Sequence, residues 1–304
     1  MNLFQQLLAP AFLFSVVRMA VPILYPALGA VVTNKAGVPN IGLEGTMLAA
    51  SLGGVIGSAL SGNAWIGLLV AILTGVMMSC ILGYFTLKLK TDVILGGIAL
   101  NLFASSATVF VLFLLTGDKG QSSSLPSKVL PNIHIPLIQD IPYLGKVLSG
   151  HNVLVYIAIL AVIVLSFILK KTQLGVHIKA VGENEKAAAS VGINVDKVRF
   201  ISFIISGILC GLGGAFLSMG YVSWFTRDMT AGRGWIALAA EAMGRGTVIG
   251  TVLSTLLFAV ASALTNVLGL FGVPTELVGT LPYVAAVIAL VVYSFINRKK
   301  KKVA

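Results

Sequence analysis

The chain has 304 residues, of which 57% are hydrophobic and only 10% are charged, whereas roughly a quarter of the residues in an average soluble domain are charged. So few charged side chains cannot cover a core of this size with a hydrated surface, which excludes a water-soluble globular protein and indicates a membrane protein. The net charge of +11 would suit a nucleic-acid-binding protein, but the Lys and Arg residues lie in short runs between apolar segments, which is typical of cytoplasmic loops.

Eight apolar segments are long enough to cross a membrane. In chain order they cover residues 11–32, 41–60, 64–87, 93–116, 153–169, 200–222, 247–268 and 275–296. Segments of about 20 apolar residues fit α-helices, whereas the strands of a transmembrane barrel have about ten residues of alternating character. Because backbone groups in lipid must find partners within the protein, we predict an all-α polytopic bundle of about 8–10 spans that forms a single transmembrane domain over residues 1–304.

The polar segments predict the orientation of this bundle. Residues 117–152 are rich in Ser, Pro, Gly and Asn and read as a long loop, whereas residues 170–199 and 298–302 are basic. Because basic segments stay in the cytoplasm, we expect 170–199 and the C-terminal tail to be cytoplasmic and 117–152 to be external. The side on which the N-terminus lies stays open. The first ten residues lack the basic region and cleavage site of a signal peptide, so we expect the first span to direct insertion.

Charge parity requires one more crossing near the C-terminus. If 200–222 leads outward, two further full spans would place the basic tail outside. The candidate for the extra crossing is 231–246, which is short, interrupted by Gly and carries Arg233 and Glu241. Irregular backbone at membrane depth is tolerated only where protein or a water-filled cavity surrounds it, so this broken span predicts a functional position.

Polar residues inside apolar segments are the candidates for the substrate pathway, because a charge at membrane depth is costly unless it is paired or hydrated. Glu44 is either a carboxylate at the membrane interface or part of a polar site at a broken helix. Arg233 and Glu241 are eight residues apart, too far for a helical pair, so Glu44 is a candidate partner for Arg233, which otherwise snorkels to the interface. The predicted pathway residues are Asn40, Glu44, Asn101, Arg233, Trp235 and Glu241.

A short helix is predicted over residues 182–192, inside the basic segment. Acidic residues lie at its start, alanines fill its middle and Gly192 suits the position after its C-cap. Its small side chains suit docking into a groove of another protein. The residues expected to take part are Glu183, Asn184, Glu185, Ala187, Ala188, Ala189 and Gly192.

The chain carries no pattern that indicates catalysis or metal binding. It has no phosphate-binding G-x-x-x-x-G-K-[ST] motif, and its three His residues are scattered over polar segments without nearby ligands. Cys80 and Cys210 lie far apart in apolar segments and read as buried thiols. We therefore predict that this chain is not an enzyme and holds neither a metal nor a cofactor.

Five sequence blocks spread over most of the chain share one resemblance. They are V-P-N-I-G-L-E-G (38–45), T-D-V-I-L-G-G-I-A-L-N (91–101), A-V-G-E-N-E-K-A-A-A-S-V-G-I-N (180–194), S-G-I-L-C-G-L-G-G-A (206–215) and G-R-G-W-I-A-L-A-A (232–240). Together they resemble the permease subunits of ABC importers for simple sugars and nucleosides, the group that includes the ribose permeases. Within that group the chain is most similar to the nucleoside-type branch, in which two different permeases pair.

The resemblance implies a type II importer fold in the cytoplasmic membrane of a bacterium. It also implies three partners: a second permease, an ATP-binding subunit that hydrolyses ATP with Mg²⁺, and a lipid-anchored or periplasmic substrate-binding protein. By the same resemblance, residues 180–194 contain the coupling helix that docks on the ATPase. One departure is visible at 241–247, where relatives often have a Trp-Asn-Pro-like turn and this chain has E-A-M-G-R-G-T. That departure affects the external gate or the partner interface and not the fold.

The sequence therefore favours a permease subunit of an ATP-driven importer of nucleosides or simple sugars that works by alternating access. The main alternative is an ion-coupled secondary transporter, for which Glu44 and Glu241 are the only plausible ionisable residues at depth. A membrane enzyme acting on lipid and a channel are further alternatives. The first lacks a clustered acid–base or metal set, and an ATP-independent conductance would reveal the second.

Overall fold

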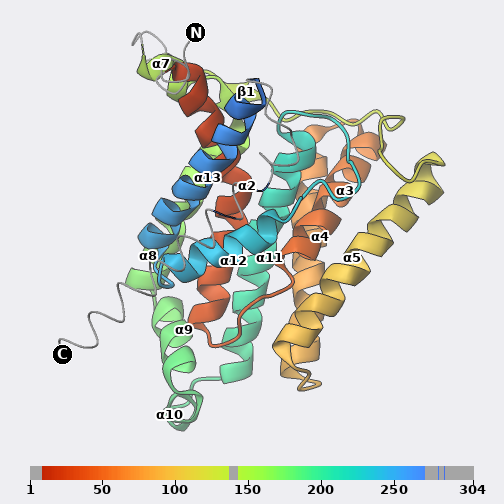
Figure 1. Ribbon diagram of the computed structural model, residues 1–304. Coiled ribbons are helices and arrows are strands. Elements are labelled where there is room, and N and C mark those ends of the chain that lie inside the picture. Colours follow the sequence, from red (N-terminus) through yellow and green to blue (C-terminus); the bar gives the residue numbers. More distant parts are fainter. Residues whose placement is uncertain (1–8, 137–142, 271–279, 281–283, 285–304) are drawn as a thin grey trace.

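The computed structural model describes residues 9–136, 143–270, 280 and 284, and these residues form helices and two short strands (Figure 1). In chain order the elements are α2 (Pro10–Lys35), α3 (Leu43–Ser61), α4 (Ala64–Leu87), α5 (Val93–Thr116), β1 (Asn132–Ile133), α7 (Leu144–Leu148), β2 (His151–Asn152), α8 (Val153–Lys171), α9 (Gln173–Glu183), α10 (Glu185–Ser190), α11 (Val195–Met219), α12 (Arg233–Met243) and α13 (Val248–Leu270).

Within the described residues, seven helices are long and apolar enough to cross a membrane: α2, α3, α4, α5, α8, α11 and α13. They coincide with seven of the predicted segments to within a few residues, and the predicted all-α fold is confirmed. The two strands contain two residues each and pair antiparallel. The predicted span 275–296 lies outside the described residues, apart from residues 280 and 284.

The centre of the bundle is α11, which packs against α2, α3 and α4. Its contact with α4 depends on small residues, because Gly207 and Gly211 are one helical turn apart and both face Gly75. A Cβ added to Gly75 would lie only 2.9 Å from the Cα of Gly211. Small residues at this spacing let two membrane helices approach closely and gain van der Waals contact, which explains the Gly-rich composition of the predicted span 200–222.

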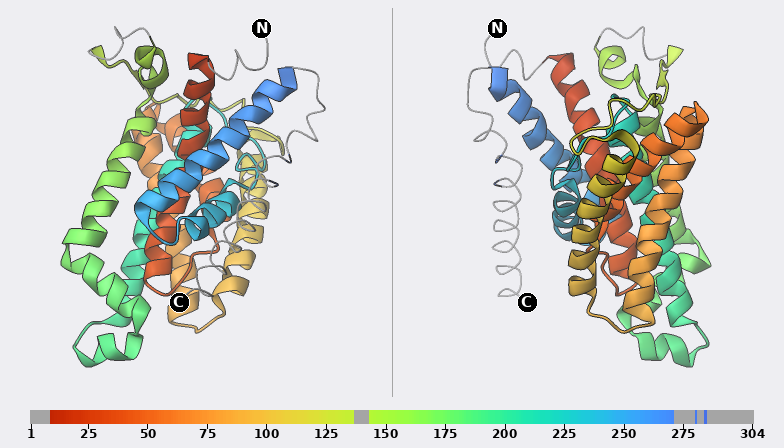
Figure 2. Two further views of the ribbon diagram at one scale, coloured as in Figure 1. Left: turned by 60° about the vertical axis from the view of Figure 1, so that its left-hand side comes forward. Right: turned by 90° about the vertical axis from the view of Figure 1, so that its right-hand side faces the viewer.

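The bundle has two distinct ends (Figures 1 and 2). The start of α2 lies with α7 and β1 at one end, here called the β1 end, whereas α9 and α10 form the opposite end, here called the α10 end (Figure 1). The described residues of 117–152 and the segment 170–199 therefore lie at opposite ends of the molecule, as the charge pattern predicts.

The chain returns through the bundle between α11 and α13 without a full-length helix. After α11 ends at Met219, residues 220–232 are irregular, and α12 contains only 11 residues. Thr247 then lies beside Lys35 and Lys170, which belong to the last turns of α2 and α8. This return segment is the broken span that charge parity predicts.

Candidate functional site

The first residues of α3 and α12 meet inside the bundle through one carboxylate. Glu44 lies in the first turn of α3, and its Oε1 accepts a hydrogen bond from the N–H of Gly232 at 2.8 Å while its Oε2 accepts one from Gly234 at 2.6 Å. Gly232 is the N-cap residue of α12, whose own side chain can accept nothing. N–H groups at a helix start lack partners within the helix, and the helix dipole favours a negative charge there. Glu44 therefore caps α12 from a different helix.

The close fit of this junction depends on a glycine. A Cβ added to Gly234 would lie 2.6 Å from both the N and the Cα of Glu44, a distance at which atoms overlap. The G-R-G-W block and the E-G block thus have adjacent backbones, although 188 residues separate Gly232 from Glu44.

The sequence made Glu44 a candidate partner for Arg233, and the structure brings their two motifs together through the backbone. The carboxylate binds backbone N–H groups on either side of Arg233. The Arg233 guanidinium donates to the carbonyl oxygens of Met229 at 3.1 Å and Thr230 at 3.0 Å. It therefore stabilises the irregular segment that leads into α12.

Asn101 supports the start of α3 from the middle of α5. Its Oδ1 accepts from the N–H of Gly45 at 2.8 Å, and its Nδ2 donates to the carbonyl of Ile41 at 3.0 Å. Asn101 follows the first residue of α5, Val93, by eight positions, which corresponds to a depth of about 12 Å along the helix. The start of α3, with Glu44, is therefore well inside the bundle rather than at its surface.

Asn40 connects three elements. Its side chain has no exposed surface, donates to Ser206 of α11 at 3.0 Å and accepts from the N–H of Gly42 at 2.9 Å. Its backbone N–H donates to Thr33 of α2 at 3.2 Å. These bonds replace the helical ones that the chain loses between α2 and α3.

A second carboxylate attaches the far end of α12. Glu241 is buried, and its Oε1 accepts a hydrogen bond from Nδ2 of Asn34 in the last turn of α2 at 2.8 Å. Trp235, by contrast, is 44% exposed. Both ends of α12 are thus fixed by carboxylates, and its exposed aromatic side chain lies between them. Sequence reasoning missed Asn34, whose only signal is a polar residue at the end of an apolar segment.

The predicted helix over 182–192 is wrong in one respect, because the chain forms two helices there. Asn184 has an extended backbone conformation, ends α9 and begins α10, and its Oδ1 accepts from the N–H of Ala187 at 3.1 Å. Asn is among the best N-cap residues, so it starts a new helix instead of continuing the old one.

The C-terminal end of α10 is as predicted. Gly192 takes a φ of +86° directly after the C-cap. Its N–H bonds to the carbonyl of Ala189 at 3.0 Å, and the N–H of Ile193 bonds to that of Ala188 at 3.1 Å. This pair of bonds is a Schellman motif. Ala188 is buried against the bundle, whereas Ala187 and Ala189 are exposed.

Arg199 joins α10 to the rest of the bundle. Its Nη2 lies 2.8 Å from a carboxylate oxygen of Glu185, and its Nε donates to the carbonyl of Ala36 at 3.3 Å. Gly182 packs directly against the backbone of Lys35. The α9–α10 segment therefore contacts the same connection, residues 36–42, that leads into the start of α3. Sequence reasoning missed Arg199, which looked like one more basic residue of a cytoplasmic loop.

At the β1 end, His151 lies in a closed environment. Its ring stacks on Phe14 with centroids 3.9 Å apart, its Nε2 lies 2.8 Å from the carbonyl of Val147, and its Nδ1 lies 3.2 Å from the Tyr221 hydroxyl. The Arg18 guanidinium lies 4.1 Å from the Tyr221 ring centroid. Burial lowers the pKa of His151, and the bond to Val147 opposes this only in part. Burial therefore favours the neutral imidazole in the folded protein.

Residues 12–292 match the family described as the permease component of branched-chain amino acid transport systems. The chain belongs to this permease family. It is 36% identical to the guanosine ABC transporter permease protein NupQ of Bacillus subtilis, covering 92% of this chain and 90% of NupQ. It is 27% identical to a second guanosine ABC transporter permease protein of that organism, NupP, over 94% of this chain and 83% of NupP.

Two further comparisons agree with this assignment. The glucose ABC transporter permease protein TsgB13 of Haloferax volcanii is 28% identical over 88% of this chain and 72% of TsgB13. A chain of a solved ABC transporter in an inward-facing conformation superposes with a TM-score of 0.56 at 15% identity, over 92% of this chain and 85% of that one, which supports the predicted importer fold. The protein is therefore a non-catalytic membrane subunit of an ABC transporter, and the family implies an ATPase and a substrate-binding protein as partners.

Proposed function

We propose that this permease imports nucleosides. The proposal depends on the 36% identity to the guanosine permease NupQ over 92% of the chain. Simple sugars are the second candidate, because the glucose permease TsgB13 matches 88% of the chain. The test is uptake of radiolabelled guanosine by proteoliposomes that contain the complete transporter with its binding protein. We expect ATP-dependent uptake that other nucleosides inhibit and glucose does not. Uptake of radiolabelled glucose without uptake of guanosine would assign the sugar class instead.

The energy source is ATP bound by the partner subunit. Uptake should continue in ATP-loaded proteoliposomes when a protonophore dissipates the ion gradient. Loss of uptake under these conditions would favour an ion-coupled secondary transporter, and Glu44 and Glu241 would then be its candidate ion-binding residues.

The proposed docking site for the ATPase is α10. It presents Ala187, Ala189 and the apolar Val191, which is 76% exposed, and both of its ends are capped by hydrogen bonds. Short helices are marginal alone, so these caps keep the surface preformed for a partner. The acidic residues Glu183 and Glu185 lie at its N-terminal end.

Movement of α10 reaches the interior through the connection 36–42. Arg199 bonds both Glu185 of α10 and the carbonyl of Ala36, and the same connection continues through Asn40 to Glu44 and α12. The domains of the ATPase close on ATP, and alternating access requires a change of bundle packing. We propose that this route of direct contacts transmits the movement of the ATPase domains to the bundle.

The face of α12 that carries Trp235 is the proposed contact with substrate. Trp235 is 44% exposed, and Glu44, Asn101 and Arg233 are half-buried. The side chains of Asn40 and Glu241 are enclosed, so we assign them the role of positioning this face. Aromatic rings stack on nucleobases and on sugar rings, which fits both candidate substrate classes.

A second, different permease is the proposed partner within the membrane. Both NupQ and NupP, two guanosine permeases of one organism, match this chain over more than nine-tenths of its length, at 36% and 27% identity. When two differently tagged copies of this chain are co-expressed with the second permease, each complex should contain one tagged copy paired with the second permease. Recovery of both tags of this chain in one complex would indicate a homodimer.

The α10 end is proposed to face the cytoplasm of a bacterial cell, and the β1 end, with the start of α2, the outside. The basic residues of 170–199 support this orientation. By the same charge rule, the tail 298–302 is assigned to the cytoplasm.

A further inference from the structure

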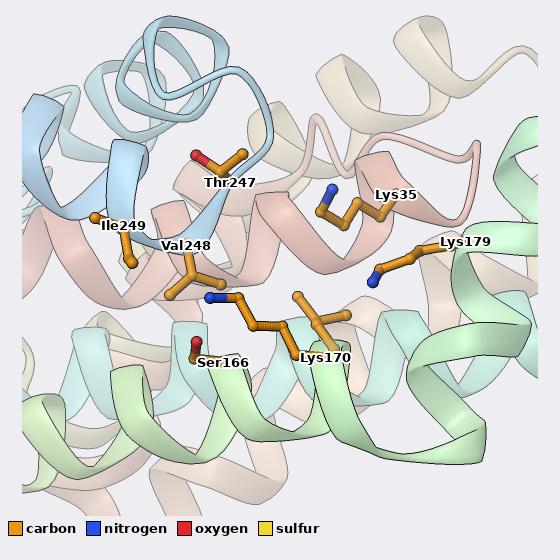
Figure 3. A pocket seen from close by; sticks show the side chains of 8 residues that line it. Lys35, Ser166, Lys170, Lys179, Thr247, Val248 and Ile249 are labelled. Carbon is orange, nitrogen blue, oxygen red and sulfur yellow. The ribbon is translucent and has the colours of Figure 1, made fainter.

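Three lysines that no other part of the proposal uses converge on one hollow at the α10 end. Lys35 closes α2, Lys170 lies in the last turn of α8 and Lys179 projects from α9. The hollow has a volume of about 390 Å³. Its remaining walls are formed by Ser166, Leu169, Thr247, Val248 and Ile249. Figure 3 shows that the three lysine side chains border this space from different elements and that the Lys170 ammonium lies next to Val248 of α13.

The charge of this hollow has little compensation from the protein. None of its lining residues is acidic, and the ion pairs found among the described residues use other cations. Glu241 interacts electrostatically with Lys35 while it accepts a hydrogen bond from Asn34. Three lysines around one hollow give it a positive potential, which favours the entry of an anion.

The position of the hollow indicates the kind of anion. Lys35 and Lys170 lie at the ends of apolar helices, the depth at which lipid headgroups lie. Further along α8 and α13, towards the middle of the span, large apolar side chains are exposed, including Ile163 (61%), Phe167 (60%) and Leu253 (63%). A ligand that fits both parts carries a phosphate and a hydrocarbon chain. Basic pockets between membrane helices are known to bind anionic headgroups.

The start of α13 adds a further attraction for a phosphate. Thr247 precedes α13, and Val248 and Ile249 are its first residues, so the positive end of this helix dipole opens on the hollow. We propose that this hollow binds the phosphate headgroup of an anionic phospholipid, whose acyl chains lie in the groove between α8 and α13. Because the same lipid contacts α2, α8, α9 and α13, it stabilises the region where the α9–α10 segment joins the bundle.

The test is lipid binding by the purified transporter complex, measured by native mass spectrometry in a neutral detergent. Dioleoylphosphatidylglycerol, dioleoylphosphatidylcholine and inorganic phosphate are added in separate titrations. We expect phosphatidylglycerol to remain bound, phosphatidylcholine to bind weakly and millimolar phosphate to compete poorly. The variant Lys35→Gln/Lys170→Gln/Lys179→Gln should weaken phosphatidylglycerol binding by roughly fivefold for each lysine removed.

A matched control removes the same charge at the same end. Lys90, Lys171 and Lys197 do not line the hollow, so Lys90→Gln/Lys171→Gln/Lys197→Gln should bind phosphatidylglycerol like the wild type. The single variants Lys170→Gln and Lys171→Gln sharpen this test, because the two residues are adjacent on one helix.

Equal loss in the two triple variants would overturn the site, as would equal binding of both lipids. If inorganic phosphate fully displaces phosphatidylglycerol, the ligand of the hollow is a free anion and not a lipid. If the permeases bind phosphatidylglycerol only after the ATPase is removed, the hollow is part of the ATPase interface. The site does not depend on which substrate is imported.

Discussion

The start of α12 and the α9–α10 segment handle charge in opposite ways. At α12, Glu44 lies inside the bundle and gives both carboxylate oxygens to backbone N–H groups. In α9–α10, Glu183 and Glu185 are exposed, and one exposed carboxylate meets Arg199. A charge at depth must be fully satisfied and therefore fixes geometry, whereas a surface charge leaves its segment adaptable. The comparison separates a rigid junction, suited to holding a pathway, from an adaptable surface, suited to a partner.

The largest effect is expected from Gly234→Ala, which attacks the rigid junction. The new Cβ overlaps the backbone of Glu44, so either α3 or α12 must shift and both hydrogen bonds to the carboxylate are strained. Overpacking of this kind costs about 1–3 kcal/mol. We expect transport to fall to near background although the protein still inserts. The control is Gly120→Ala in the loop, where the only nearby atom is a side-chain oxygen at 3.4 Å. Normal transport by Gly234→Ala would refute the close approach.

Glu44→Ala removes the cap without adding bulk, so a smaller effect is expected. Two N–H groups at the start of α12 lose their acceptor, at about 1–3 kcal/mol for a buried donor and less here because water can reach the half-buried site. Transport should drop several-fold. Glu44→Gln keeps one acceptor oxygen and should retain more activity than Glu44→Ala in the same uptake assay. If Glu44→Ala transports like the wild type, the cap that Glu44 provides to α12 is not required for transport.

Ala189→Asp tests the adaptable surface. Ala189 is exposed on α10, so a carboxylate there leaves the bundle intact but disturbs docking. We expect normal insertion, with stimulation of the partner ATPase and transport both reduced. Ala188→Asp should reduce transport further, because Ala188 is 3% exposed and the charge also disrupts the packing of α10 on the bundle. Wild-type ATPase stimulation in both variants would count against a coupling role.

The smallest effect concerns His151, which lies outside both regions. Its pKa is lowered from 6.5 by burial, so the folded state prefers the neutral ring. This stability is fully present above pH 6.5 and declines as the pH falls below that value, because the unfolded chain then binds the proton more readily. We expect Tm to fall on going from about pH 8 to about pH 5. His151→Gln should flatten this dependence, whereas His177→Gln should keep it. An unchanged slope in His151→Gln would exclude His151 as its origin.

The sequence predicted the spans well because their length and apolarity are local properties. It also located the broken span, since the count of crossings and the basic tail constrain each other. Partners across the bundle were not predictable, because one sequence carries no information on which distant backbone a carboxylate meets. The bonds from the N–H groups of Gly232 and Gly234 to Glu44 were therefore not predicted. The break at Asn184 was missed, because the alanines after it obscured its role as a cap.

The most direct test of the account is the accessibility of α10 in intact cells. In a background with Cys80 and Cys210 replaced by Ala, Ala189→Cys and Ser124→Cys place single thiols at the α10 end and in the exposed loop at the β1 end. A membrane-impermeant maleimide should label position 124 from outside. It should label position 189 only in inverted vesicles, and bound ATPase should protect that position. Labelling of position 189 from outside intact cells would contradict the account, because the proposed docking helix would then face away from the ATPase.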